Sequence, residues 1–411
     1  MPGPGMEYIG EEERSEVLDV INSGYLFRYG DSSNPSFKAK VWTLEKEFSE
    51  YAGSKYALAV TSGTVALLTA LQGLGIGPGD EVIVPGYSFV ASMSAIIYSR
   101  AIPVLAEIDE TLNLSAADIE KRISPRTKAI MAVHMLGNAC RMDEIMKVAE
   151  KYSIPVIEDT AQACGGSYKG RKLGSIGRVG AYSFNIYKTM TSGDGGMVVT
   201  SNEEIYNRCF AFHDQGHTPN RQGVEIGNRS MLGLDFRMNE LTGAVALAQL
   251  RKLEAVLQHL REIKKVFKNG IAELKNIKFR ELPDPEGECA TLLTIILPTR
   301  EIAETVGERL GAKVLLNSGW HVYRNMEQLL LKKTSDSKSC PFNCPYYGSD
   351  VKYEKGMLPQ TEDILSRSLN LSVGLRDKGI GAAWGLGPRD TVNDAEQKAE
   401  EFKKLTGDLL K

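Results

Sequence analysis

A single lysine, Lys188, lies among hydroxyl, aromatic and glycine residues in the stretch YSFNIYKTMTSGDGGMVVT, residues 182–200. Short apolar runs at both ends predict strands at residues 181–184 and 197–200, with a tight glycine-rich turn at Ser192–Gly196 between them. Such a connection would hold the amine of Lys188 in a fixed position. Taken alone, a lysine beside a glycine turn is more often a solvated side chain, so the rest of the sequence must decide.

A carboxylate that could work with this amine is Asp159. It follows the apolar run IPVI at residues 154–157 and precedes the polar segment Thr160–Gln162. The spacing predicts that Asp159 lies at the end of a buried strand and faces a crevice. Asp159 could equally be the N-cap of a following helix.

A third candidate is the turn Ser62-Gly63-Thr64, which joins a predicted strand at residues 57–60 to an apolar helix at residues 65–74. A helix N-terminus offers free backbone N–H groups and the positive end of the helix dipole, which suits a phosphate. The alternative is simple N-capping by Ser62 or Thr64.

These three features together match the anchors that pyridoxal phosphate requires. A lysine carries the cofactor aldehyde as a Schiff base, a carboxylate keeps the ring nitrogen protonated, and a helix terminus holds the phosphate. Each feature is weak evidence alone, but all three occur in one chain. We therefore expect Lys188 and Asp159 to be catalytic.

The elements around these residues alternate between strand and helix patterns, which predicts an α/β fold with a mainly parallel sheet between two layers of helices. Ligands gather at the carboxyl ends of the strands in such sheets. The segments at the carboxyl ends of the predicted strands are residues 61–64, 85–89, 134 and 159–162, and the Lys188 region. The predicted strands are residues 81–84, 103–108, 129–134 and 155–158, and the predicted helices are residues 10–23, 37–51, 87–100, 115–123 and 143–152.

The C-terminal part has a different character. A long amphipathic helix at residues 238–274 is expected to bridge two domains: a large one, residues 1–262 with an N-terminal arm at 1–36, and a small α+β one, residues 263–411. The segment 326–354 is polar and without periodicity, which indicates a surface loop near the active site or an oligomer contact. The predicted elements of the small domain are strands at 278–282, 290–297 and 314–316 and helices at 301–310 and 391–410.

The composition of the chain argues against several classes of function. The 411 residues carry a net charge of −3 without a long basic run, so we expect neither nucleic acid nor membrane as a partner. No apolar stretch approaches the ~20 residues of a membrane span. Six scattered cysteines indicate a reduced, cytoplasmic protein. Cys340 and Cys344 lack a second ligand pair nearby, so we expect no metal. A GxGxxG motif is missing after the first strand, which argues against a nicotinamide-dependent oxidoreductase.

Six motifs in order resemble the signatures of the DegT/DnrJ/EryC1/StrS family, the sugar aminotransferases of fold type I. They are VTSGTVAL, DEVIVPGYSFVAS, VIEDTAQACGG, YSFNIYKTMTSGDGGMVVT, FRMNELTGAVALAQL and LPQTEDILSRSLNLS. The resemblance covers about residues 8–375 and is weakest over residues 320–355. It implies a fold type I aminotransferase that binds pyridoxal phosphate.

The resemblance also implies roles for individual residues. Lys188 would bind the cofactor aldehyde and move the proton during amino transfer, and Asp159 would pair with the pyridinium nitrogen. Gln162 would face the phenolic oxygen. The remaining positions are Ser62, Gly63, Thr64 and Ser183 for the phosphate, Phe89 for stacking on the ring, and His321 as a small-domain histidine near the substrate.

Two positions depart from the family pattern. Asp194 replaces the usual glutamate of a GEGG motif and keeps a carboxylate. Asp235 stands where many relatives have an asparagine that reaches the phosphate across a dimer interface. A carboxylate there would repel a phosphate unless it is paired, and Arg237 is the expected partner.

The implied reaction is a ping-pong transamination from glutamate or glutamine to a keto or aldehyde sugar, either a nucleotide sugar or the 8-position of an octulosonate. A keto-cyclitol of the scyllo-inosose type is an alternative acceptor. A non-catalytic regulatory relative that binds pyridoxal phosphate is a further alternative, against which the intact Lys188 and Asp159 argue. The resemblance also implies a homodimer.

Overall fold

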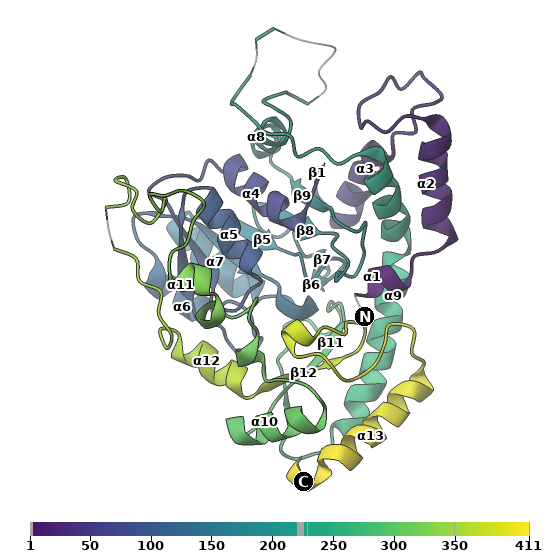
Figure 1. The fold of residues 1–411 in the computed structure, drawn as a ribbon, viewed down its shortest axis with the longest axis vertical. Coiled ribbons are helices and arrows are strands. Elements are labelled where there is room, and N and C mark those ends of the chain that lie inside the picture. The colour runs from purple at the N-terminus through teal and green to yellow at the C-terminus, as the bar shows by residue number, and fades with distance from the viewer. Residues whose placement is uncertain (1–2, 220–225, 228, 349, 411) are drawn as a thin grey trace.

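The computed structural model describes residues 3–219, 226–227, 229–348 and 350–410. Its centre is a seven-stranded sheet in the order β1-β9-β8-β5-β4-β2-β3 (Figure 1). Its strands are β1 (Tyr56–Val60), β2 (Glu81–Pro85), β3 (Ile102–Ala106), β4 (Thr127–Val133), β5 (Val156–Asp159), β8 (Val179–Ser183) and β9 (Gly196–Thr200). Within this sheet β9 alone runs opposite to the other six strands, so the prediction of a mainly parallel sheet is confirmed.

Helices cover both faces of the sheet because successive strand residues point to opposite sides. In β1, Leu58 and Val60 pack in one core and Ala57 and Ala59 in the other. The first core includes apolar residues of α4 (Gly63–Gly73), α5 (Val90–Tyr98) and α8 (Glu203–His213). The second includes those of α3 (Lys40–Ala52), α6 (Ala116–Arg122), α7 (Met142–Tyr152) and α9 (Glu240–Ile271). The predicted sandwich is therefore confirmed.

The smaller C-terminal part contains an antiparallel sheet of β10 (Lys278–Phe279), β11 (Leu292–Ile296) and β12 (Ser368–Ser372). Helix α9 supports both parts, because α2 (Glu11–Ser23), α3 and α13 (Val392–Leu410) all pack along it (Figure 1). The boundary proposed at residue 262 falls inside this continuous helix. The other short elements are α1 (Pro4–Glu7), β6 (Ser167–Tyr168), β7 (Arg171–Lys172), α10 (Arg300–Arg309), α11 (Glu327–Leu330) and α12 (Pro359–Ser366).

Several predicted elements were wrong in position or type; the helix predicted from residue 37, for example, begins at Lys40. The helix predicted from residue 87 begins at Val90, because the N–H of Ser88 instead donates to the carbonyl of His321, at 2.9 Å. The strand predicted at residues 314–316 is a 3₁₀ turn, Leu315–Asn317. A buried apolar run this short does not distinguish a strand from a turn. Helices α8 and α12 and strand β12 were not predicted.

None of the described residues of the segment 326–354 lines the candidate site. The Tyr347 hydroxyl donates to Glu81 at the start of β2, at 2.7 Å, and Arg126 lies over the Tyr347 ring. The Tyr353 hydroxyl donates to the carbonyl of Pro103 in β3, also at 2.7 Å. These buried tyrosines hold the segment toward the amino ends of the strands, opposite the edge at which the candidate site lies. The described helices include none with the length and apolarity to cross a bilayer.

Candidate active site

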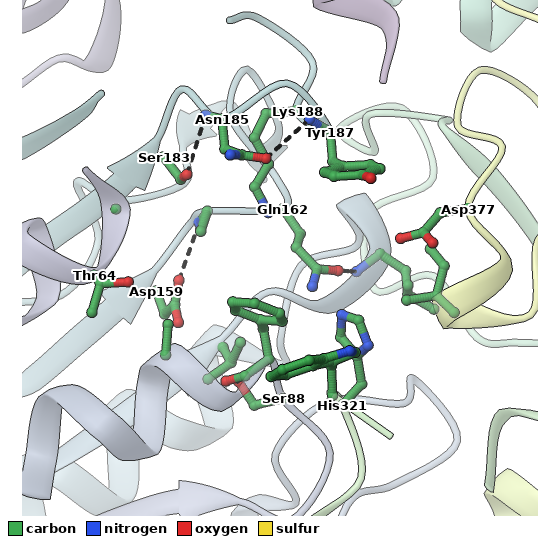
Figure 2. Close-up of a pocket in the computed structure, with 18 of the residues that line it drawn as sticks. Thr64, Ser88, Asp159, Gln162, Ser183, Asn185, Tyr187, Lys188, His321 and Asp377 are labelled. Carbon is green, nitrogen blue, oxygen red and sulfur yellow. Dashed lines mark hydrogen bonds between the residues drawn. The ribbon is translucent and has the colours of Figure 1, made fainter. Parts of the chain in front are cut away.

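A cavity of about 510 Å³ opens at the carboxyl ends of the central strands and is closed on one side by the C-terminal part (Figure 2). It has the size and mixed polarity of a cofactor site. All the residues that the sequence singled out for the cofactor and substrate line it: Ser62, Gly63, Thr64, Phe89, Asp159, Gln162, Ser183, Lys188 and His321. His134, at the end of a predicted strand, turns its ring away from this cavity toward Glu158.

The turn before α4 forms one end of the cavity. The Ser62 side chain caps the helix by accepting from the N–H of Val65 at 3.2 Å. A Cβ on Gly63 would lie 2.4 Å from the Cβ of Ser183, so only glycine allows the turn to approach β8 this closely. The N–H groups of Gly63 and Thr64 belong to the first helical turn, which contains no acceptor for them. They can therefore bind an anion.

The Lys188 connection is held from both sides. Its own N–H donates to the carbonyl of Asn185 at 3.0 Å. On the other side the N-terminal segment lies against this connection. The N–H of Gly3 donates to the backbone carbonyl of Ile186 at 2.9 Å, and the N–H of Gly5 donates to the backbone carbonyl of Lys188 at 3.1 Å. A Cβ on Gly3 would lie 2.4 Å from the Tyr187 carbonyl carbon. Residues 3–5 thus help to hold the connection that carries Lys188.

The Lys188 amine lies in an enclosed and partly apolar environment. Burial lowers the pKa of Lys188, and the charges of Asp159 and Asp377 only partly oppose this shift. Lys188 is the only lysine or arginine among the described residues that line the cavity. A lysine with a lowered pKa has a larger neutral fraction, which is the form that can attack a carbonyl or accept a proton.

Asp159, at the end of β5, is 4% exposed and has two hydrogen-bond donors from the chain. The Ser92 hydroxyl donates to Oδ2 at 2.7 Å, and the Ala161 N–H donates to Oδ1 at 3.1 Å. Burial raises the pKa of Asp159, and the Ser92 hydrogen bond acts against this shift. Ser92 is in turn 2.6 Å from Ser88, so a pair of buried serines fixes the Asp159 rotamer.

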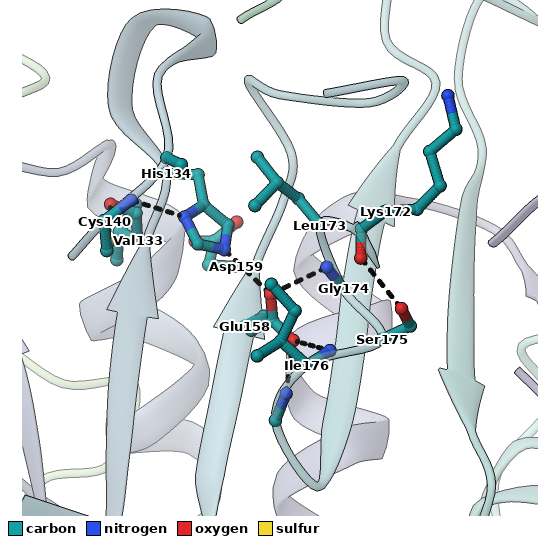
Figure 3. Close-up of polar contacts among 12 residues, drawn as sticks. Val133, His134, Cys140, Glu158, Asp159, Lys172, Leu173, Gly174, Ser175 and Ile176 are labelled. Carbon is teal, nitrogen blue, oxygen red and sulfur yellow. Dashed lines mark hydrogen bonds and ion pairs between the residues drawn. The ribbon is translucent and has the colours of Figure 1, made fainter. Parts of the chain in front are cut away.

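The residue before Asp159 forms a separate buried network on the opposite side of the strand (Figure 3). Glu158 accepts hydrogen bonds from the N–H groups of Gly174, Ile176 and Gly177. His134 Nδ1 accepts from the Cys140 N–H at 3.1 Å, so its proton is on Nε2 and is donated to Glu158 at 3.0 Å.

These donors decide the charge of Glu158. Burial alone would raise the pKa of Glu158, but the hydrogen bonds from His134 and the backbone hold the pKa below its usual value. The His134 backbone N–H also donates to the Asp159 carbonyl at 3.0 Å. This network therefore fixes the strand end that carries Asp159.

Gln162 has a defined amide orientation. Its Oε1 accepts from the N–H of Leu136 at 3.0 Å, so the Nε2 donors face the cavity (Figure 2). The turn at Leu136 is held by the buried guanidinium of Arg280, which donates to the carbonyls of Met135 and Leu136 at 3.2 and 2.8 Å. Burial lowers the pKa of Arg280 to about 10. Arg280 was not predicted as part of the site.

Phe89 and His321 come from different parts of the chain and meet over the cavity. The N–H of Val90 donates to the Trp320 carbonyl and the N–H of Tyr323 donates to the Gly86 carbonyl, both at 2.9 Å. This pairing places the His321 ring 5.3 Å from the Phe89 ring. Phe89 is 40% exposed, with its ring open to the cavity.

The two departures from the family pattern have partners in the structure. Asp194 accepts from the side-chain amide of Asn185 at 3.0 Å, and both line the cavity. Asp235 pairs with Arg237 at 2.5 Å, as expected, and Arg237 also binds Asp214. The negative charge of Asp235 is therefore compensated within the chain.

Comparison with known proteins identifies the family of this chain. The family model described as the DegT/DnrJ/EryC1/StrS aminotransferase family matches residues 7–376. The chain is similar to the GDP-perosamine synthase of Escherichia coli O157:H7, with 41% identity over 305 residues, 74% of this chain and 80% of that protein. It is also similar to the spore coat polysaccharide biosynthesis protein SpsC of Bacillus subtilis, with 32% identity over 88% of this chain and 90% of that protein.

Solved structures agree with this family. The aminotransferase from Psychrobacter cryohalolentis has a TM-score of 0.78 and 26% identity, over 100% of this chain and 99% of that chain. DesV of S. venezuelae, solved in complex with a ketimine intermediate, has a TM-score of 0.75 and 27% identity, over 96% and 94% of the two chains. The chain therefore belongs to the DegT/DnrJ/EryC1/StrS aminotransferase family and is an aminotransferase of fold type I.

Proposed function

We propose that this aminotransferase moves an amino group from glutamate or glutamine to a keto or aldehyde sugar, with pyridoxal phosphate as its cofactor. The observation that carries this proposal is the meeting of Lys188, Asp159 and the free N-terminus of α4 in one cavity. In an α/β fold these groups come from three different strand ends.

The residues present fit pyridoxal phosphate. The α4 N-terminus and the hydroxyls of Thr64 and Ser183 suit its phosphate, and the absence of a side chain at Gly63 is what lets that N-terminus lie next to Ser183. Asp159 provides a carboxylate for the ring nitrogen and Gln162 an amide donor for the phenolic oxygen. When bound, this cofactor supplies a ring that accepts electrons from the substrate carbon.

The chain contributes proton transfer and orientation. Because burial lowers the pKa of Lys188, its amine can accept a proton from one substrate carbon and return it to the next. Ser92 and Ala161 hold the Asp159 carboxylate in one orientation. Phe89 provides an apolar surface on which a planar ring can stack.

For the acceptor we propose a nucleotide-linked sugar, because relatives that share 36–41% of their matched residues with this chain are named GDP-perosamine synthase. The 8-position of an octulosonate and a keto-cyclitol remain alternative acceptors for the same site.

We also propose a homodimer. The helix α2 and the loop after it expose Leu18, Ile21, Leu26 and Phe27, each with about half of its surface accessible. Leu18 and Ile21 are three positions apart and so share one face of α2, and exposed apolar residues that cluster mark a protein interface. The six cysteines are all free thiols, which supports the cytoplasm as the compartment.

The reaction can be tested in reverse with GDP-perosamine as amino donor. Purified protein loaded with pyridoxal phosphate is incubated with GDP-perosamine and 2-oxoglutarate, and glutamate formation is followed by mass spectrometry. We expect glutamate, and its loss in Lys188→Ala by at least about 10²-fold.

An aminated octulosonate and an amino-cyclitol serve as parallel donors. Glutamate from one of these alone would replace the nucleotide sugar as the acceptor. No amino transfer from any of the three, in protein that binds the cofactor, would overturn the proposed reaction in favour of a non-catalytic relative.

A further inference from the structure

His321 faces the cavity with one ring nitrogen and has a partner at the other. The residue is only 7% exposed, and its ring lines the cavity with Gln162 and Lys188 (Figure 2). No described residue makes a hydrogen bond to Nε2. At the other nitrogen, Nδ1 lies 2.9 Å from the Ser318 hydroxyl oxygen.

The Ser318 hydroxyl has a second contact that fixes its proton. Its oxygen lies 2.5 Å from the carbonyl oxygen of Gly379. A carbonyl oxygen only accepts, so Ser318 must donate its single proton there. Toward His321 the hydroxyl can then only accept, and Nδ1 must carry a hydrogen.

The charge of the ring follows from its surroundings. Burial, reinforced by the nearby Lys188, lowers the pKa of His321 to about 3. The imidazole is therefore neutral at physiological pH and has a single N–H. With that hydrogen on Nδ1, Nε2 has a free lone pair.

We propose that Ser318 is a positioning residue that holds His321 in its Nδ1-protonated tautomer, so that Nε2 faces the cavity as a hydrogen-bond acceptor for a hydroxyl group of the sugar. The assignment of a sugar hydroxyl rests on the proposed function, whereas the tautomer does not. A hydroxyl next to the reacting carbon can donate to Nε2, but a carbonyl or carboxylate oxygen at the same place cannot. The arrangement thus selects hydroxylated substrates.

The hydrogen bonds of Ser318 to His321 and Gly379 join two loops of the C-terminal part. Gly379 lies in the turn Lys378–Ile380, and its N–H donates to the side chain of Asp377 at 2.7 Å. Asp377 and Gly379 also line the cavity. The carbonyl that accepts from Ser318 is therefore held by the same turn that places Asp377 at the site.

The tautomer can be measured directly by NMR. The chain has 5 histidines, so protein labelled with ¹⁵N-histidine and deuterated elsewhere gives a small set of long-range ¹H–¹⁵N correlations. His321→Gln identifies the His321 signals by their disappearance. We expect a protonated, pyrrole-type Nδ1 and an unprotonated, pyridine-type Nε2 between pH 6 and 8, in protein without substrate.

Two variants test the part played by Ser318. Ser318→Ala should move the proton of His321 to Nε2 or produce a mixture of tautomers, and Ser318→Thr, which keeps the hydroxyl, should retain the wild-type pattern. A wild-type Nε2–H tautomer, a charged ring at pH 7, or an unchanged tautomer in a folded Ser318→Ala would overturn the proposal.

The kinetic consequence distinguishes this proposal from the proposed function. With an accepted amino sugar, Ser318→Ala should raise KM by about tenfold, the loss of one hydrogen bond, with a smaller effect on kcat. A sugar without the hydroxyl should show no difference between wild type and variant. If the tautomer is as proposed but no sugar reacts, the proposed function fails and the tautomer assignment stands.

Discussion

The residue with the most direct influence on the candidate chemistry, apart from Lys188 and Asp159 themselves, is Ser92. Its hydroxyl donates to the Asp159 carboxylate at 2.7 Å inside the core. Because burial raises the pKa of Asp159 and this hydrogen bond opposes the shift, removing it raises that pKa further. Asp159 would then need a higher pH to carry the charge that we propose pairs with the ring nitrogen of the cofactor.

Ser92→Ala should therefore lower kcat/KM by about 10-fold or more, the value of a hydrogen bond to a charged group. The acid side of the pH profile of kcat/KM should move to higher pH. Ser99→Ala is the matched control, because Ser99 is a buried serine of the same helical region whose hydroxyl donates to the Ile96 carbonyl. An acid limb that moves equally in both variants, or in neither, would contradict the role of Ser92.

At the scale of elements, the N-terminal segment and the Lys188 connection depend on each other. A Cβ on Gly5 would lie 2.7 Å from the Met190 carbonyl carbon, which is backbone and cannot rotate away. Gly5→Ala should push the two segments apart and make the position of Lys188 less fixed. We expect faster loss of the bound cofactor on dialysis, measured by absorbance, with little change in circular dichroism. Gly407→Ala, where nothing lies within 4 Å, is the control.

The Glu158 network makes strand β5 rigid at the point where Asp159 leaves it. Glu158→Gln replaces a fully buried acceptor that binds four donors, His134 and the N–H groups of Gly174, Ile176 and Gly177. The free energy of unfolding should fall by about 3–5 kcal/mol, the usual result of breaking a buried charged network. Urea unfolding at pH 7 measures this loss.

The pH dependence of the same variant has a definite sign. The folded pKa of Glu158 lies below its unfolded value, so its stabilisation is fully present above about pH 4.3 and disappears as the pH falls through the folded value. The difference between wild type and Glu158→Gln should shrink in acid. Glu254→Gln, which weakens the partly exposed contacts of Glu254 with Lys172 and Tyr51, should cost less, at most about 1 kcal/mol. Equal losses in the two variants would refute the special role of the network.

At the scale of the whole molecule, the exposed apolar residues of α2 are the feature that points to a second subunit, because the described part of the chain leaves Leu18 and Ile21 about half exposed. Ile21 is 52% exposed, so an aspartate there should not disturb the isolated fold. Ile21→Asp should shift the protein from dimer toward monomer in analytical ultracentrifugation. Tyr98→Asp, at a site 63% exposed on α5, should leave the mass unchanged. A wild-type monomer at micromolar concentration would refute the dimer.

The sheet and the main candidate residues could be predicted from the sequence because each depends on a local pattern. The alternation of apolar runs with helix patterns predicted the sheet. The Lys188 turn, Asp159 and Ser62–Thr64 were predicted to lie at strand ends, where such folds bind ligands. What could not be predicted depends on contacts between distant residues. Gly3 and Gly5 lie against residues more than 180 positions later, and Arg280 holds a turn near Leu136. Ser92 had one local signal, a polar residue in the apolar helix VASMSAIIY.

The measurement that tests the central claim most directly is the site of covalent attachment. Protein loaded with pyridoxal phosphate is reduced with borohydride, digested and sequenced by mass spectrometry, with Lys188→Ala as control. We expect the pyridoxyl group on Lys188 in nearly every molecule and no comparable modification in the variant. A pyridoxyl group on other lysines with Lys188 unmodified, or the same labelling in Lys188→Ala, would contradict the assignment of this cavity as the cofactor site.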